Sequence, residues 1–513
     1  MIREQSSNQT VLDFYLPFDG KLDPNNRWVK LAETIPWDEL GAVYCRSLSR
    51  TMGPPATPSR VVIGAMIIKH MKKLADEEVI EDIRENPYYQ YFLGFSDFQN
   101  RTIFVPSLFV EIRKRLGQEQ LSEINHLFLS HVNKDSNQDD RPTDPPTNSP
   151  TGNGSETPPA QTKKQHSGML ILDASVAPSD IRYPTDVELL NTAREKAEYI
   201  IDELWKLSPI GLKPRTYRQV ARKEYLAFSH QRKPWKKTIR KMLGKQLGYL
   251  RRDLGHIDRL LDQHPDAFPL KHKYQRTLWI IRELYDQQRW MYDHRRHQVS
   301  DRIVSISQPY VRPIVRGKAG KRTEFGAKIS GVVIDGYVYL DNLSWNAYNE
   351  QEDLIQAVGA YRDRFGYYPE SVNADKIYWN RKNRSYLKSE GINLYGGSPL
   401  GRPVIKDQMS IDQRNKHREQ SNRRNWIEAK FGEGKRKYGL GLVMAKTART
   451  SESWIAMVIF VMNLARQMRN LSLSLFLSLI KMVKKQWFWS KEIVRPLMVV
   501  FSCFETHNAD AKS

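Results

Sequence analysis

A polar segment divides this chain into two parts that must fold separately. Residues 134–168 consist almost entirely of polar residues, Pro and Gly. This composition offers too little apolar surface to offset the conformational entropy that folding would cost. We therefore expect a disordered linker here, with an N-terminal domain over residues 1–133 on one side and all remaining structure on the other.

The N-terminal part has helical periodicity. Thr57-Pro58 is a start signal, because a hydroxyl cap precedes a Pro at the first helical position. Apolar residues then recur at helical spacing, at Ile63, Met66, Ile67, Met71 and Leu74, and a second short helix should carry Val79, Ile80 and Ile83. The pair could be a helix-turn-helix that reads DNA. An ordinary helical packing or dimerisation module is slightly favoured, and both readings stay open.

Strand and helix signals alternate after the linker. Met169–Leu172 is a short apolar strand ending at Asp173, and Asp335-Gly336 is the two-residue turn of a hairpin. The remaining predicted elements follow in order. They are a helix over 352–365, a strand over 371–374 that leads into Asp375, a helix over 381–389, a strand over 393–396, and a long polar helix from about 411 through Glu428.

A long helical stretch interrupts this pattern. It opens at the capping box Thr185–Glu188 and continues to about residue 300, with breaks at Pro214 and Pro234. Without it, the order is strand, hairpin, helix, strand, helix, strand, helix, which is that of an RNase H-like α/β domain with a mixed sheet and flanking helices. We expect this domain to comprise residues 169–184 and 311–470. Residues 185–310 would be a helical insertion, and 471–513 a helical tail.

Three carboxylates occupy suggestive places in this order. Asp173 and Asp375 follow adjacent strands, and Glu428 lies on the last helix. Phosphodiester cleavage needs charge neutralisation and alignment, which two Mg²⁺ ions on carboxylate ligands supply. The element order favours this set over its acidic rivals, which are Asp180, Asp186, Asp335, Asp341, Glu419 and Glu433.

Cations surround the last of these acids. Arg424 lies one helical turn before Glu428 and Lys435 two turns after it, on the same face if the helix continues. Such cations could grip phosphates beside a metal-binding carboxylate. The alternative is a simple ion pair between Arg424 and Glu428. Further candidate DNA contacts are Arg381, Arg384 and Arg423.

The charge balance favours a polyanionic partner. The chain carries 80 Lys and Arg against 58 Asp and Glu, a net charge of +22. Residues 213–252 alone hold 14 basic residues and one acid, with aromatic residues interleaved. This stretch suits a DNA backbone, although a solvated face is the alternative. Its candidate DNA contacts are Lys236, Lys237, Arg240 and Lys241.

Localisation signals are sparse. Cys45 and Cys503 are the only cysteines, which fits a reducing cytosol without a disulfide framework. The N-terminus has no apolar signal core. The longest apolar runs, over 454–464 and 471–480, are shorter than the ~18 residues a membrane span requires. We read them as a buried helix and expect a cytoplasmic, nucleoid-associated protein without a membrane span.

At these residues the sequence resembles the DDE transposases of bacterial insertion sequences. Their last catalytic segment has the pattern Tyr-x2-Arg-x3-Glu-x6-Lys. Arg424, Glu428 and Lys435 match its spacing, whereas Ser421 stands at the Tyr position. Asp173, in LILDASVAPSDIRYPTD, and Asp375, in VNADKIYWNRKNRSYLKSEGI, look like the first two acids. The N-terminal block from PFDGKLDP to YYQYFLGF also resembles these enzymes.

The resemblance implies a mechanism and partners. Asp173, Asp375 and Glu428 would hold two Mg²⁺ ions, for which Mn²⁺ could substitute. The enzyme would bind the terminal inverted repeats of its element as double-stranded DNA, hydrolyse the strand at each end, and join the 3′-hydroxyl to target DNA, as a homodimer that pairs two ends. Two other classes remain. One is a catalytically silent DNA-binding regulator, although all three acidic positions are kept; the other is an RNase H-like nuclease that cuts without joining.

Overall fold

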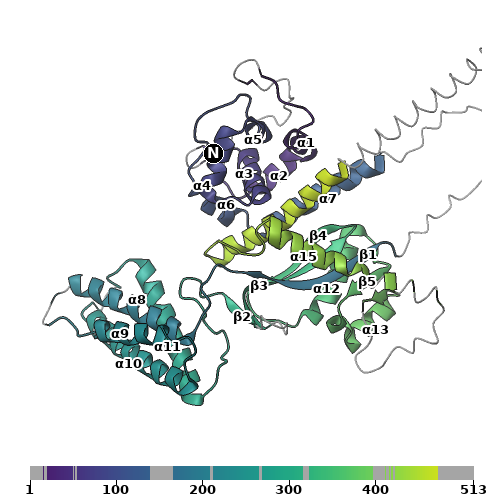
Figure 1. Ribbon diagram of the computed structural model, residues 1–513. Coiled ribbons are helices and arrows are strands. Elements are labelled where there is room, and N and C mark those ends of the chain that lie inside the picture. Colours follow the sequence, from purple (N-terminus) through teal and green to yellow (C-terminus); the bar gives the residue numbers. More distant parts are fainter. Residues whose placement is uncertain are drawn as a thin grey trace, which may run out of the picture. The chain divides into compact units, whose positions relative to one another are not determined.

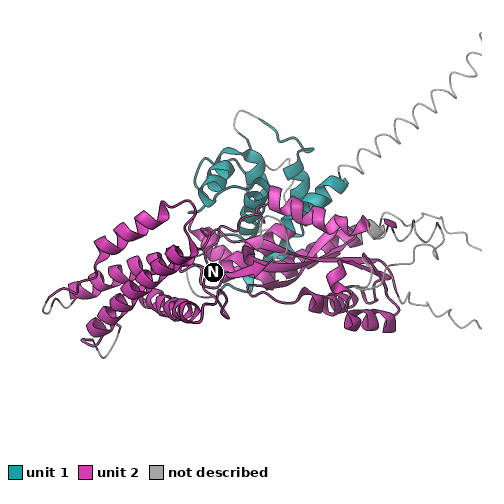
Figure 2. Cartoon of the chain, turned by 60° about the horizontal axis from the view of Figure 1, so that its bottom comes forward, with its two compact units in different colours: residues 1–105, 460–513 teal, residues 106–459 magenta. Residues whose placement is uncertain are grey.

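A computed structural model describes three stretches of the chain. They are residues 15–138 (except 17–19, 50 and 52–54), 166–396 (except 208, 210–211, 265–267 and 316–322), and 411–471 (except 412–414, 416–417 and 420–421). Most of the expected linker, the expected tail beyond residue 471, and Ser421 lie outside the described residues. By its contacts the chain forms two compact units, Met1–Val105 with Phe460–Ser513, and Pro106–Ile459 (Figure 2).

The first unit is helical in its N-terminal part. Its helices are α1 (Arg27–Thr34), α2 (Trp37–Cys45), α3 (Ser59–Lys72), α4 (Asp76–Glu85) and α5 (Pro87–Phe92). Edge-on aromatic contacts centre on Phe92, whose ring lies 5.2 Å from those of both Trp28 and Trp37. The two predicted helices are confirmed as α3 and α4, except that Pro58 is the residue before α3 rather than its first.

A mixed six-stranded sheet forms the centre of the second unit (Figure 1). Its strands are β1 (Met169–Pro178), β2 (Arg312–Val315), β3 (Thr323–Ile334), β4 (Tyr337–Ser344), β5 (Ser371–Ala374) and β6 (Asn393–Tyr395). The order is β2-β3-β1-β5-β6, and β4 also pairs with β3. β1 is antiparallel to β3 and parallel to β5, which is parallel to β6. The expected mixed α/β architecture is therefore confirmed.

The predicted hairpin is confirmed, and β1 is longer than predicted. Asp335 and Gly336 have φ values of 49° and 79°, as a tight turn between β3 and β4 requires. β1 does not end at Asp173, because it pairs with β3 from Ile171 to Pro178. Asp173 therefore lies inside the strand. β2 was not predicted, and it pairs with the part of β3 that precedes the hairpin.

Helices complete the second unit. α12 (Asp353–Phe365), α13 (Arg381–Ser389) and α15 (Asn425–Lys437) follow the hairpin, β5 and β6 in sequence. α15 continues beyond Glu428 to Lys437 and packs against β1 and β3. α6 (Leu108–Arg115) and α7 (Gln118–Gln138) precede the sheet, and the end of α7 falls within the range expected to be linker. The apolar run over 454–464 is buried in a helix over 448–471, as expected.

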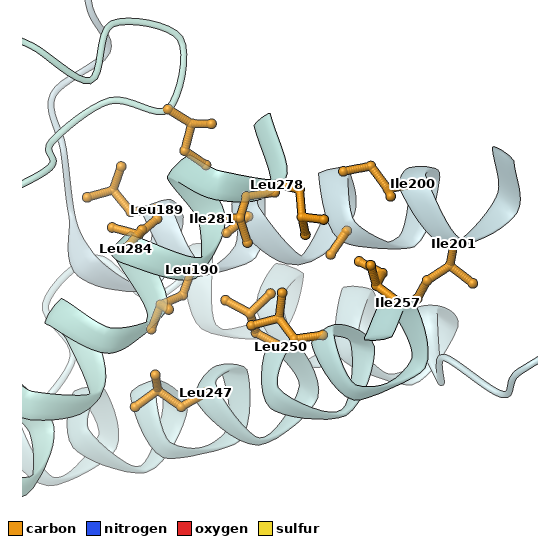
Figure 3. Close-up of a cluster of buried hydrophobic side chains, with 14 of the residues drawn as sticks. Leu189, Leu190, Ile200, Ile201, Leu247, Leu250, Ile257, Leu278, Ile281 and Leu284 are labelled. Carbon is orange, nitrogen blue, oxygen red and sulfur yellow. The ribbon is translucent and has the colours of Figure 1, made fainter. Parts of the chain in front are cut away.

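The basic insertion has a hydrophobic core of its own. It consists of α8 (Asp186–Leu207), α9 (Arg218–Ser229), α10 (Lys236–Leu261) and α11 (His272–His294), which confirms the helical prediction for this stretch. Leu190, Leu250 and Ile281 come from α8, α10 and α11 and lie together in this core (Figure 3). Across the described part of the chain, no helix is long and apolar enough to cross a membrane.

Candidate active site

Asp173 is held within the centre of the sheet. It pairs with Gly331 of β3, and its Oδ1 accepts a hydrogen bond of 2.9 Å from the Ala174 backbone N–H. Burial raises the pKa of Asp173 to about 6, against the lowering effects of that hydrogen bond and of Arg424; Asp375 and Glu350 raise it further. Asp173 thus shares its electrostatic surroundings with the second predicted acid.

Asp375 follows the neighbouring strand in parallel register. Leu172 of β1 is paired with Ala374 of β5, so Asp173 and Asp375 are the next residues along both strands. The Asp375 carboxylate caps the short 3-10 helix η4 (Lys376–Tyr378) and accepts a 2.6 Å hydrogen bond from the Lys376 N–H. Its side chain is 47% exposed, which leaves oxygen atoms accessible to a ligand.

Glu428 depends on how α15 packs against the sheet. Ile427, Phe431 and Gly434 are the buried positions of this helix, and they place Glu428 at the margin of its packed face. The contact point is Gly331, because a Cβ there would lie only 2.8 Å from the Phe431 ring. Gly331 is also the strand partner of Asp173. One glycine therefore sets the position of α15 beside the first acid.

Arg424 joins the second and third acids. Its Nη1 lies 3.2 Å from Asp375 Oδ1, and its Nη2 lies 3.2 Å from Glu428 Oε1. The ion pair with Glu428 is the one that helical spacing predicts, whereas the contact with Asp375 has no sequence signal. The structure thus brings all three predicted acids around one guanidinium, which contacts two of them directly and lowers the pKa of Asp173.

The donor set suits a hard divalent cation. Asp173, Asp375 and Glu428 supply the carboxylate oxygens that Mg²⁺ prefers. Within the described ranges, however, no group of three or more His, Cys, Asp or Glu side chains is arranged to hold a metal ion. Arg424 explains this in part, because its guanidinium occupies the position between Asp375 and Glu428 where a cation would bind both.

The supporting cations have different surroundings. Arg423 Nη2 lies 2.8 Å from Glu419, and its Nη1 approaches the sulfur of Met169 at the start of β1. Lys435 lies two turns beyond Glu428 on α15 and is half-buried. Arg381 and Arg384 are exposed on α13, along a groove beside β6.

Arg240 has different contacts from the other three candidate DNA-binding residues of the insertion. Lys236, Lys237 and Lys241 are exposed in the first two turns of α10. Arg240 instead donates a 3.0 Å hydrogen bond to the Tyr292 carbonyl and lies 4.2 Å above the Tyr292 ring. These contacts tie α10 to α11, so Arg240 has a structural role. All four residues lie on α10 and not on the elements that carry the three acids.

Two acidic rivals and one unpredicted acid have distinct roles. Asp335 is a turn residue, as its positive φ requires. Burial raises the pKa of Asp341, on β4, to about 6. Glu350, in the 3-10 helix η3 (Glu350–Glu352), lies 3.1 Å from Lys328 and raises the pKa of Asp173. Sequence reasoning missed Glu350 because it falls between the hairpin and α12, outside any motif.

Two segments of the chain match known protein families. Residues 372–465, which include Asp375 and Glu428, match the family described as "Transposase DDE domain". Residues 16–115 match the family described as "Transposase domain (DUF772)". A protein of Rhizobium meliloti, "Uncharacterized protein ORF8 in nfe locus", is 37% identical over 106 residues, which are 21% of this chain and 51% of the relative. The matched region thus spans about half of that relative.

No solved structure matches the chain. The two family matches lie on either side of the expected linker, one in the N-terminal helices and the other on the segment that carries Asp375, Arg424 and Glu428. The N-terminal match precedes the match that carries the acids, as the N-terminal block precedes the acidic segments in the sequence resemblance. Two separate segments of the chain are therefore similar to transposase domains.

Proposed function

We propose that this protein binds the terminal inverted repeats of its own element, hydrolyses one strand at each end, and joins the 3′-hydroxyl to target DNA. The observation that carries the proposal is the bridge from Arg424 to Asp375 and Glu428 beside Asp173. Three carboxylates from two adjacent strands and one facing helix meet around a single cation. This is the arrangement that a phosphodiester-processing site requires.

The sheet topology supports an RNase H-like catalytic domain. The elements β1, β3–β4, α12, β5, α13, β6 and α15 follow one another in the order of that fold, with the helical insertion and β2 added between β1 and β3. β1 is central, antiparallel to β3 and parallel to β5. Asp173 then lies in β1, and Asp375 directly follows the neighbouring strand β5.

Asp173, Asp375 and Glu428 would hold two Mg²⁺ ions, or Mn²⁺ in their place. Bound there, the ions would activate the attacking oxygen and stabilise the leaving oxygen. The chain's own residues then bind and orient the DNA. Arg424, which pairs with two carboxylates, would turn to a phosphate, and Lys435 and Arg423 would contact the flanking backbone.

The other parts of the chain would supply the grip on DNA. The N-terminal domain would bind DNA or pair two protomers into a homodimer, and the exposed lysines of α10 would contact the phosphate backbone. The protein would act in the cytoplasm, associated with the nucleoid. These roles suit the net charge of +22.

A strand-transfer assay tests this function. The full-length protein is incubated with Mg²⁺, a labelled duplex from the end of its element with a pre-cut 3′-hydroxyl, and a target plasmid. A transposase yields labelled DNA joined to the plasmid. Cleavage of an uncut end without joining would identify a nuclease instead, and binding without either product would identify a silent regulator. Each of these last two results would overturn the proposal.

A further inference from the structure

An open groove runs between α13 and β6. It has a cavity volume of about 670 Å³, and its lining includes Trp379, Arg381, Arg384, Lys388, Ile392 and Leu394. Trp379 follows Asp375 by four residues, so the groove starts next to the candidate active site and follows α13 away from it. None of its lining residues belongs to the three acids or to Arg424.

Three cations line one side of this groove. Arg381, Arg384 and Lys388 are spaced at i, i+3 and i+7, which brings them to one face of α13. All three are exposed, and their side chains form no ion pair or hydrogen bond with any residue that the structure describes. Cations in such a row are free to bind phosphate groups.

The rest of the groove is aromatic and apolar. The indole nitrogen of Trp379 is shielded from solvent and has no hydrogen-bond partner within the described residues. Ile392 is buried and Leu394 lies in β6, next to it along the wall. The groove therefore offers an aromatic and apolar wall beside a row of cations.

These features indicate the size and chemistry of the ligand. A volume near 670 Å³ falls in the range of about 300–1,000 Å³ that is typical of sites for small ligands. A duplex, whose major groove alone is about 12 Å wide, is too large to enter it. A single nucleotide has the required combination, because it joins an anionic phosphate to a flat base with hydrogen-bond acceptors.

We propose that this groove binds a nucleotide of an unpaired DNA strand next to the cleavage site. Arg381, Arg384 and Lys388 hold its phosphate, and its base lies against Trp379, Ile392 and Leu394. This inference rests on the proposed function, because it takes DNA as the partner. It adds a binding site for an unpaired strand, which a protein that binds only duplex DNA would not need.

Fluorescence anisotropy of the full-length protein tests the groove. Binding is measured without divalent metal, so that no strand is cut, for a blunt duplex of the element's end and for the same duplex with a short unpaired thymidine extension. The extension should tighten wild-type binding by at least about fivefold, since stacking one base contributes that much or more. Lys388→Glu should remove this gain and leave binding of the blunt duplex within about twofold.

Lys382→Glu is the matched control, because Lys382 is exposed on the same helix but does not line the groove. It should keep the full gain. The groove proposal is overturned if the extension adds nothing, or if Lys388→Glu and Lys382→Glu act alike. Strand transfer by the wild-type protein would still stand in each case, so this failure is distinct from that of the proposed function.

Discussion

Arg424 at the start of α15 reaches Asp375 at the end of β5, with 3.2 Å between its Nη1 and the carboxylate Oδ1. The same guanidinium holds Glu428 at 3.2 Å. Its side chain is 24% exposed, while the two carboxylates are about half exposed. The two acids are therefore accessible, and one cation from the chain itself offsets one of their two negative charges.

This arrangement predicts competition between Arg424 and a divalent ion. Arg424→Gln removes the guanidinium from between Asp375 and Glu428, so Mn²⁺ binding should become several-fold tighter in a calorimetric titration of the DNA-free protein. Stability should change by less than about 1 kcal/mol, because these ion pairs are partly exposed. Arg423→Gln is the control, since Arg423 pairs with Glu419. Weaker Mn²⁺ binding in Arg424→Gln alone would show that Arg424 supports the metal site rather than competing with it.

A second prediction concerns the contact between α15 and the sheet. Gly331→Ala adds a Cβ about 2.8 Å from the Phe431 ring, so α15 and Glu428 must shift away from Asp173. A displacement of about 1 Å can lower activity about 100-fold, so strand transfer should fall steeply while the protein stays folded. Combining it with Phe431→Leu removes the clash and should restore part of the activity. A Gly331→Ala variant with full activity would mean that this contact does not set the position of Glu428.

The insertion should bind DNA through its exposed lysines. Replacing Lys236, Lys237 and Lys241 together by Glu should weaken binding and reduce the slope of log affinity against log salt by about 0.9 for each lost phosphate contact. Lys206→Glu on α8 is the control, because Lys206 is exposed and paired with Glu203. An unchanged salt slope in the triple variant would contradict the role of α10. Arg240→Glu should instead lower the melting temperature, since it breaks the contacts with Tyr292.

The insertion core should lose stability as pH rises. Asp253 is fully buried, and neither of its carboxylate oxygens has a hydrogen-bond partner among the described residues. Burial raises the pKa of Asp253 from 3.8 to about 8, and Glu198 raises it further, against the lowering effect of Arg194. Because the folded pKa exceeds the unfolded one, the stabilising contribution is complete below pH 3.8. It is lost as pH rises to about 8, by up to about 1.4 kcal/mol per pH unit.

Thermal unfolding of the Asp253→Asn variant measures this effect. The neutral amide cannot ionise, so the variant should lose less stability than the wild type between about pH 5 and about pH 8. Asp258→Asn on the same helix is the control, because Asp258 is half-exposed. Identical pH dependence in the wild type and Asp253→Asn would show that Asp253 does not titrate in this range.

Local patterns predicted most of the elements that carry the site. β5 and α13 have the bounds that apolar runs and caps indicate, and Asp335-Gly336 forms the predicted turn. These local patterns failed where pairing with a distant strand, rather than local sequence, determines the secondary structure. The segment from Ala174 to Pro178 has small residues that resemble a loop, yet β3 holds it as strand. β2 contains Pro313, which has no backbone N–H to donate. A strand tolerates Pro at the edge of a sheet, and β2 is such a strand because it pairs with β3 alone.

The structure brings the three predicted acids together, but the sequence did not indicate all of their contacts. Helical spacing alone pairs Arg424 with Glu428. Its second contact, with Asp375, depends on how α15 packs against the sheet through Phe431, and no spacing in the sequence encodes it. The contact of Arg240 with Tyr292 likewise depends on how α10 packs on α11, and no spacing in the sequence indicates it.

Asp173, Asp375 and Glu428 are proposed to form one catalytic site. The most direct test is the yield of joined product from a pre-cut end for Asp173→Asn, Asp375→Asn and Glu428→Gln. Asp363→Asn is the control, because Asp363 is 70% exposed on α12. Each of the three variants should lose at least about 100-fold in joining while it binds the DNA end as the wild type does, and the control should join normally. Wild-type joining by any of the three would contradict the account.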